Sequence, residues 1–198
     1  DIKQIVGSMF WLNDECQIVL LCPCRKAYAE LCRIITNARR RSGKGNYQLF
    51  EWDLMSIRHC LILWLPTHQE CDHYWGRWLN QHHANRLWVA IQRHLSNNDT
   101  EYIAHCEQLA HEFQLPITAC GGVLMHDVER LPLQHVLTAI KHGCSVDKLG
   151  FDRISNTERA LRPFKKLVRI YKPEWLEEST YIADLCEFKL SDLKYEYP

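Results

Sequence analysis

Residues 97–120, NNDTEYIAHCEQLAHEFQLPITAC, place a helix directly in front of a strand. Asp99 or Thr100 can cap the first turn of the helix, and Pro116 stands just beyond its end. The apolar stripe at helical spacing consists of Ile103, Cys106, Leu109, Ala110 and Phe113. Residues 117–120 then read as a short buried strand. A strand that follows a helix in this way indicates a parallel sheet connected by crossover helices.

Apolar runs with a similar character precede this stretch. Three of them are strand-like, namely QIVLLC at 17–22, HCLILWLP at 59–66 and RLWVAIQ at 86–92. Helical patterns at 25–41 and 71–83 separate them. We therefore predict an α/β fold, either a barrel or an open doubly wound sheet.

The last quarter of the chain carries a different pattern. From residue 151 the strand-like runs stop, and two helix-like stretches follow, NTERALRPFKKLVRIY at 156–171 and PEWLEESTYIADLCEF at 173–188. We predict a main domain over residues 1–150 and a helical extension over residues 151–198.

Composition excludes several classes of protein. Lys plus Arg number 24 and Asp plus Glu number 24, so no overall basic field attracts nucleic acid. The ten cysteines are scattered through apolar runs without the spacing of a disulfide framework, which predicts reduced thiols. No apolar run reaches the roughly 18 residues that a membrane helix needs, and no signal peptide opens the chain. We expect a cytoplasmic protein without membrane contact.

Six segments resemble a known family when they are taken together and in order. They are IVGSMF (5–10), AYAELCRIITNARRRSGKGNY (27–47), RLWVAIQRH (86–94), ITACGGVLMH (117–126), PLQHVLTAIKHGCSV (132–146) and the helical run from 156 to 198. They resemble the PHP (polymerase and histidinol phosphatase) domain of bacterial family C DNA polymerases, and most of all its error-prone branch, the paralogues of the DNA polymerase III alpha subunit. The resemblance implies part of a distorted (β/α) PHP barrel, followed by the C-terminal helical extension. It also implies that the parent protein is a DNA-directed nucleotidyltransferase in DNA replication, repair and translesion synthesis.

The metal ligands that the resemblance implies are altered in this chain. Where the family has Gly-Asp-x-His, the stretch ACGGVLMHD at 119–127 has Gly122 at the Asp position and Leu124 at the His position. The Glu of the family's Gly-x-Glu-Phe segment is Met9 here, a thioether where a hard cation needs an oxygen. His94 stands where the family keeps a histidine ligand, and one imidazole does not hold a metal. We therefore expect a degenerate metal site and no cofactor in this chain.

Other histidines could suggest a site but lack suitable partners. His126 and Asp127 are adjacent and would face opposite ways on a strand, so we interpret them as a loop into the next helix. His68, Cys71 and His73 have no Cys-x-x-Cys partner for structural zinc and are interpreted as the polar start of a helix. The remaining helical candidates, interpreted as solvated, are His82, His83, His105 and His111.

One dense positive run stands out in the neutral chain. Arg39, Arg40, Arg41 and Lys44 lie at a predicted helix end, where cations favour the helix dipole. They are candidates for contact with DNA phosphates or a protein partner, with a solvated helix end as the alternative.

The chain start suggests a fragment of a longer polypeptide, because Asp1–Gly7 reads as a segment entering a strand and lacks an initiating Met. A strand through Ile5 and Val6 would then lack a neighbour. We expect another copy of the chain or a rearranged local segment to cover that edge.

Two functions follow from the resemblance. The favoured one is a metal-free PHP segment that braces the rest of the polymerase chain and offers a surface to DNA or to other replication and damage-response proteins. The alternative is a metal-dependent phosphoesterase or 3′–5′ exonuclease, with His94 and His126 recruited into an altered site.

Overall fold

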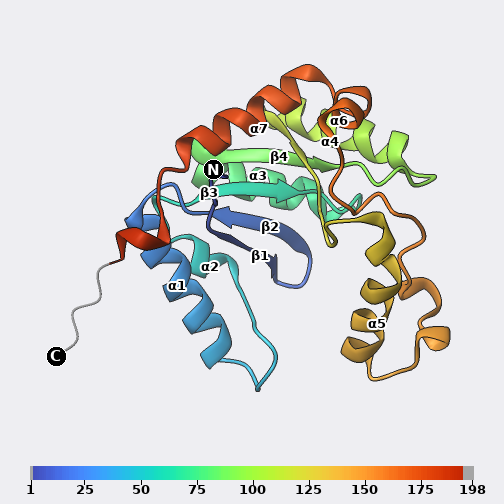
Figure 1. Ribbon diagram of the computed structural model, residues 1–198. Coiled ribbons are helices and arrows are strands. Elements are labelled where there is room, and N and C mark those ends of the chain that lie inside the picture. Colours follow the sequence, from blue (N-terminus) through green and yellow to red (C-terminus); the bar gives the residue numbers. More distant parts are fainter. Residues whose placement is uncertain (1, 194–198) are drawn as a thin grey trace.

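The computed structural model describes residues 2–193, which form a mixed α/β fold around one five-stranded sheet (Figure 1). The strands lie in the order β1-β2-β3-β4-β5. Their bounds are Gly7–Leu12 (β1), Cys16–Leu21 (β2), Leu61–Leu65 (β3), Leu87–Gln92 (β4) and Ile117–Cys120 (β5). The pairs β3–β4 and β4–β5 are parallel as predicted, whereas β1–β2 and β2–β3 are antiparallel.

The antiparallel start of the sheet corrects the prediction of a purely parallel one. Asn13 and Asp14 follow β1 with φ angles of 52° and 60°. This left-handed conformation is one that Asn and Asp tolerate, and it suits the tight turn of a hairpin. The pair Asn13-Asp14 between two apolar runs was the available sequence signal for this hairpin.

The sheet is open, because β1 and β5 each pair with one strand within residues 2–193. The strand predicted through Ile5 and Val6 begins only at Gly7. The end of β1 is partly covered by a local segment: Tyr47 Oη accepts the backbone N–H of Trp11 at 2.8 Å, and Leu49 forms an isolated bridge with Leu12. The prediction of a barrel therefore stays a prediction.

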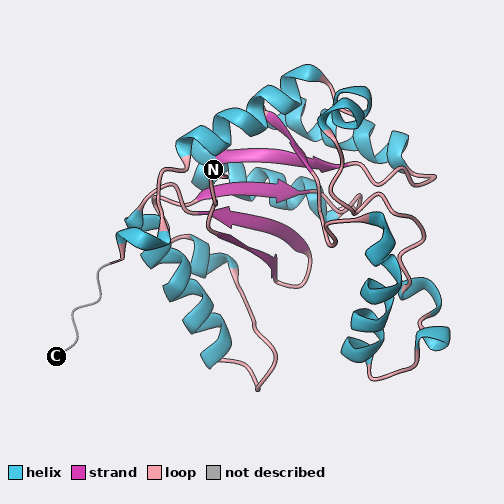
Figure 2. Ribbon diagram, in the orientation of Figure 1, coloured by secondary structure: helices cyan, strands magenta, loops and turns pink. Residues whose placement is uncertain are grey.

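Helices lie on both faces of the sheet (Figure 2). They are α1 Arg25–Arg40, α2 Glu51–Leu54, α3 Cys71–His83, α4 Asp99–Phe113, α5 Leu131–His142, α6 Phe164–Ile170 and α7 Pro173–Leu185. The larger core lies between one face and α1, α3 and α4, and includes the fully buried Trp64 and Trp75. The smaller core joins the other face to the α7 end of the chain through Trp88, Ile182 and Cys186.

The predicted stretch from 97 to 120 folds as expected except at its cap. Helix α4 is followed by β5, but the N-cap is Asn98, and the Asp99 carboxylate faces away from the first turn of the helix. It accepts the backbone N–H groups of Leu95 and Ser96 at 3.0 and 3.1 Å. Asp99 thus closes the loop after β4 instead of capping α4.

The C-terminal extension packs on the sheet and is less helical than predicted. Only Phe164–Ile170 of the helix predicted at 156–171 is α-helical. Pro163 disfavours a helical backbone at the residue before it, so 156–162 cannot continue the helix upstream. Helix α7 lies against β5. Residue 1 and the predicted extension beyond 193 lie outside the described residues.

No helix among residues 2–193 is long and apolar enough to cross a membrane. All ten cysteines lie in this range and are free thiols, five of them buried: Cys16, Cys22, Cys60, Cys106 and Cys186.

Candidate functional site at the carboxyl ends of the parallel strands

Ligands of parallel sheets bind where the strands end, and the sequence places His94 and Gly122 there. His94 follows β4 by two residues and Gly122 follows β5 by two. Burial lowers the pKa of His94, and the charges of Arg159 and Arg162 lower it further. The Nε2 atom of His94 is buried without a hydrogen-bond partner in the described part of the chain. The structure therefore holds a partly buried imidazole at this edge, in surroundings that disfavour its charged form.

The segment 156–162 crosses these strand ends and bonds to their loops. Asn156 Nδ2 donates to the backbone oxygen of His94 at 2.8 Å, and Arg159 Nε donates to that of Gly122 at 2.9 Å. Arg162 Nη1 donates to the backbone oxygen of Arg93 at 2.7 Å. Sequence reasoning missed this segment because it assigned the residues to a helix.

Tyr171, the residue after α6, contacts the loops at the same edge of the sheet. Its hydroxyl donates to the backbone oxygen of Cys120 at 2.8 Å and accepts the backbone N–H of Arg93 at 3.0 Å. Arg162 Nη2 also donates to it, at 3.2 Å. The loops after β4 and β5 are thus joined to the C-terminal segment through one buried phenol.

The donor set at this edge does not suit a metal cation. The nearby guanidinium groups of Arg159 and Arg162 bring positive charge, which repels a cation at short range. Burial of the Arg159 guanidinium lowers its pKa. Within residues 2–193, no group of three His, Cys, Asp or Glu side chains is arranged to hold a metal.

The three positions that lack the family's ligands do not share one site here. Gly122 has φ of 53°, and a Cβ on it would lie 2.7 Å from Gln92 Oε1. Leu124 is 43% exposed. Met9 lies on β1, separated from β5 by three strands or about 19 Å at the usual strand spacing. Met9 and the loop that holds Gly122 therefore lie at opposite edges of the described sheet.

His126 and Asp127 form the loop into the next helical turn, as predicted. Both are exposed, and Asp127 Oδ1 accepts the backbone N–H of Glu129 at 2.8 Å. Asp127 therefore caps the short 3-10 helix Val128–Arg130. The capping role accounts for its position without a metal.

Two members of the positive run are committed to contacts within the chain. Arg41 forms a bidentate pair with Asp53, at 2.6 and 2.9 Å. Arg39 donates to the backbone of 45–46 and its guanidinium lies 5.5 Å from the Tyr47 ring centroid. The remaining two basic side chains, Arg40 and Lys44, are exposed. A contact with DNA or a partner stays a prediction, and these two side chains are its best candidates.

Two histidines interpreted as solvated are in fact packed. His105 Nε2 lies 2.9 Å from the carboxylate of Asp72, which is buried. His83 is 3% exposed, and its Nδ1 lies 2.8 Å from a guanidinium nitrogen of Arg86. Local sequence does not indicate either contact, because His105 contacts Asp72 on another helix and the contact of His83 is with the guanidinium of Arg86 in the turn after α3.

Comparison with known proteins identifies relatives over the whole chain, although no family model matches it. A protein of Vibrio parahaemolyticus named error-prone DNA polymerase is 85% identical over 198 residues, and one of Vibrio vulnificus with the same name is 62% identical over 197. A more distant one, from Teredinibacter turnerae, is 40% identical over 198 residues. The chain covers 19% of each of these proteins, so it spans about a fifth of their length. Along all of its residues, the chain is therefore similar to a segment of proteins named error-prone DNA polymerase.

Proposed function

We propose that this chain is the PHP segment of an error-prone DNA polymerase III alpha-type subunit and that its role is structural and partner-binding. The parent protein would carry out DNA-directed DNA synthesis in replication and damage tolerance, in the cytoplasm. The rest of the polymerase chain would be the first partner of this segment. A metal-dependent exonuclease is disfavoured because the guanidinium groups of Arg159 and Arg162 bond to the loops after β5 and β4, where their positive charge repels a cation.

An exposed apolar stripe on α5 carries the proposal. Leu133, Val136, Leu137 and Ile140 recur at helical spacing, and they are 50%, 42%, 53% and 70% exposed. The side of α5 that faces the rest of the chain contributes His135 and Ala139 instead. An apolar stripe of this kind in water indicates a surface that another element covers.

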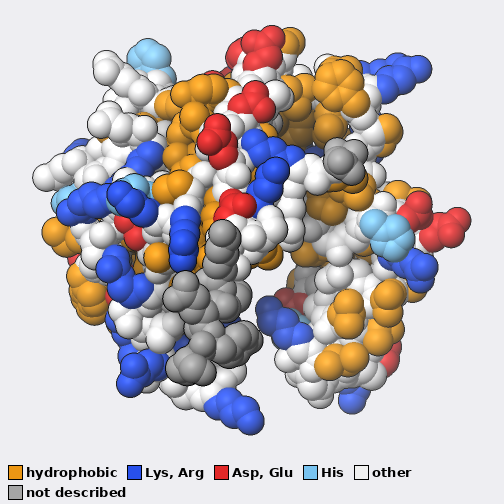
Figure 3. All heavy atoms as spheres, turned by 60° about the vertical axis from the view of Figure 1, so that its left-hand side comes forward, with side chains coloured by type: hydrophobic (Ala, Val, Ile, Leu, Met, Phe, Trp, Pro, Cys, Tyr) orange, Lys and Arg blue, Asp and Glu red, His pale blue; other side chains and the backbone are white. Residues whose placement is uncertain are grey.

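The setting of α5 supports this reading. The helix stands away from the sheet (Figure 1), and hydrophobic side chains gather on the lower right lobe of the surface (Figure 3). The relatives are about five times as long as this chain, so polymerase segments that could cover α5 exist in the parent protein.

Placing lysine at Leu137 and Ile140 of the full-length polymerase should expose α5. Burying one leucine or isoleucine side chain favours docking by about 1.5–3 kcal/mol. Replacing two of them by lysine should therefore remove most of the free energy that holds α5 against another element. We expect backbone amide exchange in residues 131–142 to rise at least severalfold, as measured by hydrogen exchange with mass spectrometry. The matched control is Lys141→Ser on the same helix, which should leave exchange unchanged. Equal exchange in the double variant and the wild type would mean that α5 is not a docked surface.

Restoring two family ligands should not restore a nuclease. We expect the full-length variant with Gly122→Asp and Leu124→His to show no metal-dependent degradation of a DNA 3′ end. The aspartate would be strained at φ of 53° and would press on Gln92. Position 9 would still carry the thioether of Met9 where the family has a glutamate. The assay is release of 3′ nucleotides with and without Mn²⁺. Metal-dependent release by this variant, or stoichiometric metal in the wild type, would favour the exonuclease alternative.

A further inference from the structure

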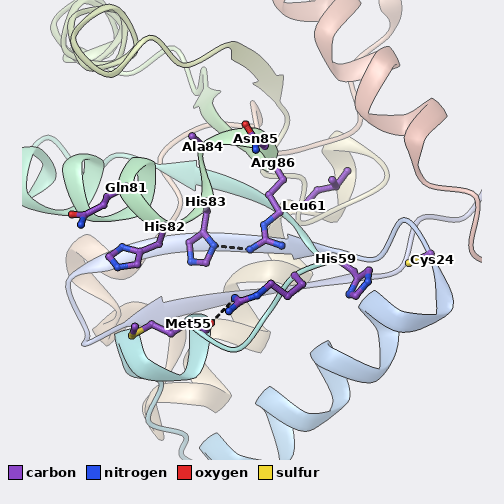
Figure 4. Close-up of a pocket in the computed structure, with 11 residues that line it drawn as sticks. Cys24, Met55, His59, Leu61, Gln81, His82, His83, Ala84, Asn85 and Arg86 are labelled. Atoms are coloured by element: carbon purple, nitrogen blue, oxygen red, sulfur yellow. Dashed lines mark hydrogen bonds between the residues drawn. The ribbon is translucent and has the colours of Figure 1, made fainter.

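A second hollow lies at the opposite edge of the sheet, by the amino ends of β3 and β4. It has a volume of about 800 Å³. Its walls come from the turn before β3 and from the end of α3 with the turn that follows it (Figure 4). The polar and charged lining includes Arg58, His59, His82, His83 and Arg86. Among residues 2–193, no acidic side chain lines it.

The positive charge of this hollow is only partly balanced by the chain. Arg58 Nη1 donates to the backbone oxygens of Met55 and Ile57, which carry no net charge. The nearest carboxylate, Glu30, is buried and already accepts the backbone N–H groups of residues 58, 59 and 60. Glu30 Oε1 also lies 2.8 Å from Nδ1 of His59, so this carboxylate balances charge only at the His59 wall of the hollow.

Arg86 has unused hydrogen-bonding capacity. A single terminal nitrogen of its guanidinium makes both of its bonds, to the backbone oxygen of Ile57 and to His83 Nδ1, each at 2.8 Å. A guanidinium carries five N–H donors on three nitrogens. The other two nitrogens of Arg86 have no acceptor within residues 2–193. Burial lowers the pKa of Arg86, and the charge of Arg58 lowers it further.

His83 adds a donor that lacks an acceptor. Because a guanidinium can only donate, His83 Nδ1 must accept from Arg86, which places the ring proton on Nε2. This Nε2 is buried and has no hydrogen-bond partner in the described part of the chain. Figure 4 shows His83 beside His82, on the same side of the hollow as Arg86. Because this nitrogen is closed to solvent, the donors that the chain offers to the hollow are those of Arg58 and Arg86.

Flat and apolar surfaces lie next to these donors. His82 stacks on Trp78 with ring centroids 4.6 Å apart, and Met55 and Leu61 line the hollow. A planar base could lie against such a wall while phosphate oxygens meet the guanidinium groups.

We propose that this hollow binds the phosphate of a nucleotide or of a nucleic-acid strand, through Arg58, Arg86 and the histidines beside them. A phosphate fits better than a carboxylate because its oxygens are arranged tetrahedrally around phosphorus and can accept from two guanidinium groups at once. A volume of this order accommodates a ligand the size of a nucleotide. The site lies at the sheet edge opposite the loops that hold His94 and Gly122, and it does not depend on the structural role proposed above.

The test uses Cys24, a half-buried thiol that lines the hollow. In the full-length polymerase, its alkylation rate is measured by peptide mass spectrometry with inorganic phosphate, a deoxynucleoside triphosphate or a short single-stranded oligonucleotide. We expect at least one of these to slow alkylation by roughly fivefold or more, because a covered thiol reacts slowly. Protection by the triphosphate alone identifies a free nucleotide, and protection by the oligonucleotide alone identifies a strand. The matched control is Cys32, an exposed thiol on α1 outside the hollow, which should react at the same rate throughout.

Two variants tie protection to the proposed residues. Within residues 2–193 the side chain of Arg58 bonds only to its own turn, so Arg58→Gln should weaken protection without disturbing other elements. Combining it with Arg86→Gln should abolish protection. Arg77→Gln, an exposed arginine outside the lining, should have no effect. Protection that survives the double variant would overturn the proposal, as would no protection by any of the three probes. Cys24 that is unreactive before any addition would also overturn it, because the polymerase itself would then fill the hollow.

Discussion

Replacing Asp72 by alanine should lower the free energy of unfolding by about 3–5 kcal/mol, the usual cost of removing one partner from a buried charged network. Asp72 lies in the first turn of α3 and is 1% exposed. Its carboxylate accepts the backbone N–H groups of Thr67, His68 and Gln69 at 3.1, 2.8 and 3.2 Å. It also lies 2.9 Å from His105 Nε2 on α4. Alanine would leave all of these donors without an acceptor, and urea unfolding at neutral pH measures the loss.

Two further variants separate the charge network from a general effect of removing acid from this loop. Asp72→Asn keeps one acceptor oxygen and should lose less stability than alanine, because several of the N–H groups retain a partner. Glu70→Ala removes an exposed acid with no capping hydrogen bond and should change stability by less than about 0.5 kcal/mol. A loss below about 1 kcal/mol for Asp72→Ala would show that solvent satisfies these donors.

Local periodicity was enough to predict much of the fold. Helix α3 spans Cys71–His83 and strand β5 spans Ile117–Cys120, as their patterns indicate. The same reasoning fails at β1 and β2, where a turn of Asn13 and Asp14 makes an antiparallel hairpin. Apolar runs show that strands exist, but their direction depends on the connections between them.

The candidate site was predictable only in its local parts. The position of His94 after β4 and the loop role of Asp127 follow from neighbours in the sequence. The hydrogen bonds of Arg159 and Arg162 to the strand-end loops join residues 37 and 69 positions apart, which no local pattern encodes. His83 was misread for a related reason, because its burial depends on how the end of α3 packs against other elements.

Replacing Gly76 by alanine should destabilise the protein by about 3 kcal/mol, at the upper end of the usual cost of overpacking a core. Gly76 lies in the middle of α3, facing α4 and β3. A Cβ there would lie 2.3 Å from Phe113 Cε2 and 2.7 Å from Trp64 Cη2. Trp64 is fully buried and Phe113 is 9% exposed, so neither ring can move into solvent without losing its packing. The gain in helix propensity from glycine to alanine, about 1 kcal/mol, is too small to offset the clash.

The matched control for this glycine is Gly43→Ala. A Cβ on Gly43 would meet no heavy atom within 4 Å, and this glycine has no positive φ that alanine would strain. The free energy of unfolding of the Gly43→Ala variant, measured in urea, should therefore stay within about 0.5 kcal/mol of the wild type. Combining Gly76→Ala with Phe113→Leu should recover part of the loss, because the smaller side chain vacates the space that the new methyl group needs. If Gly76→Ala proves neutral, α3 and α4 can separate at little cost, and the close approach of these helices is then not what fixes α3 against the sheet.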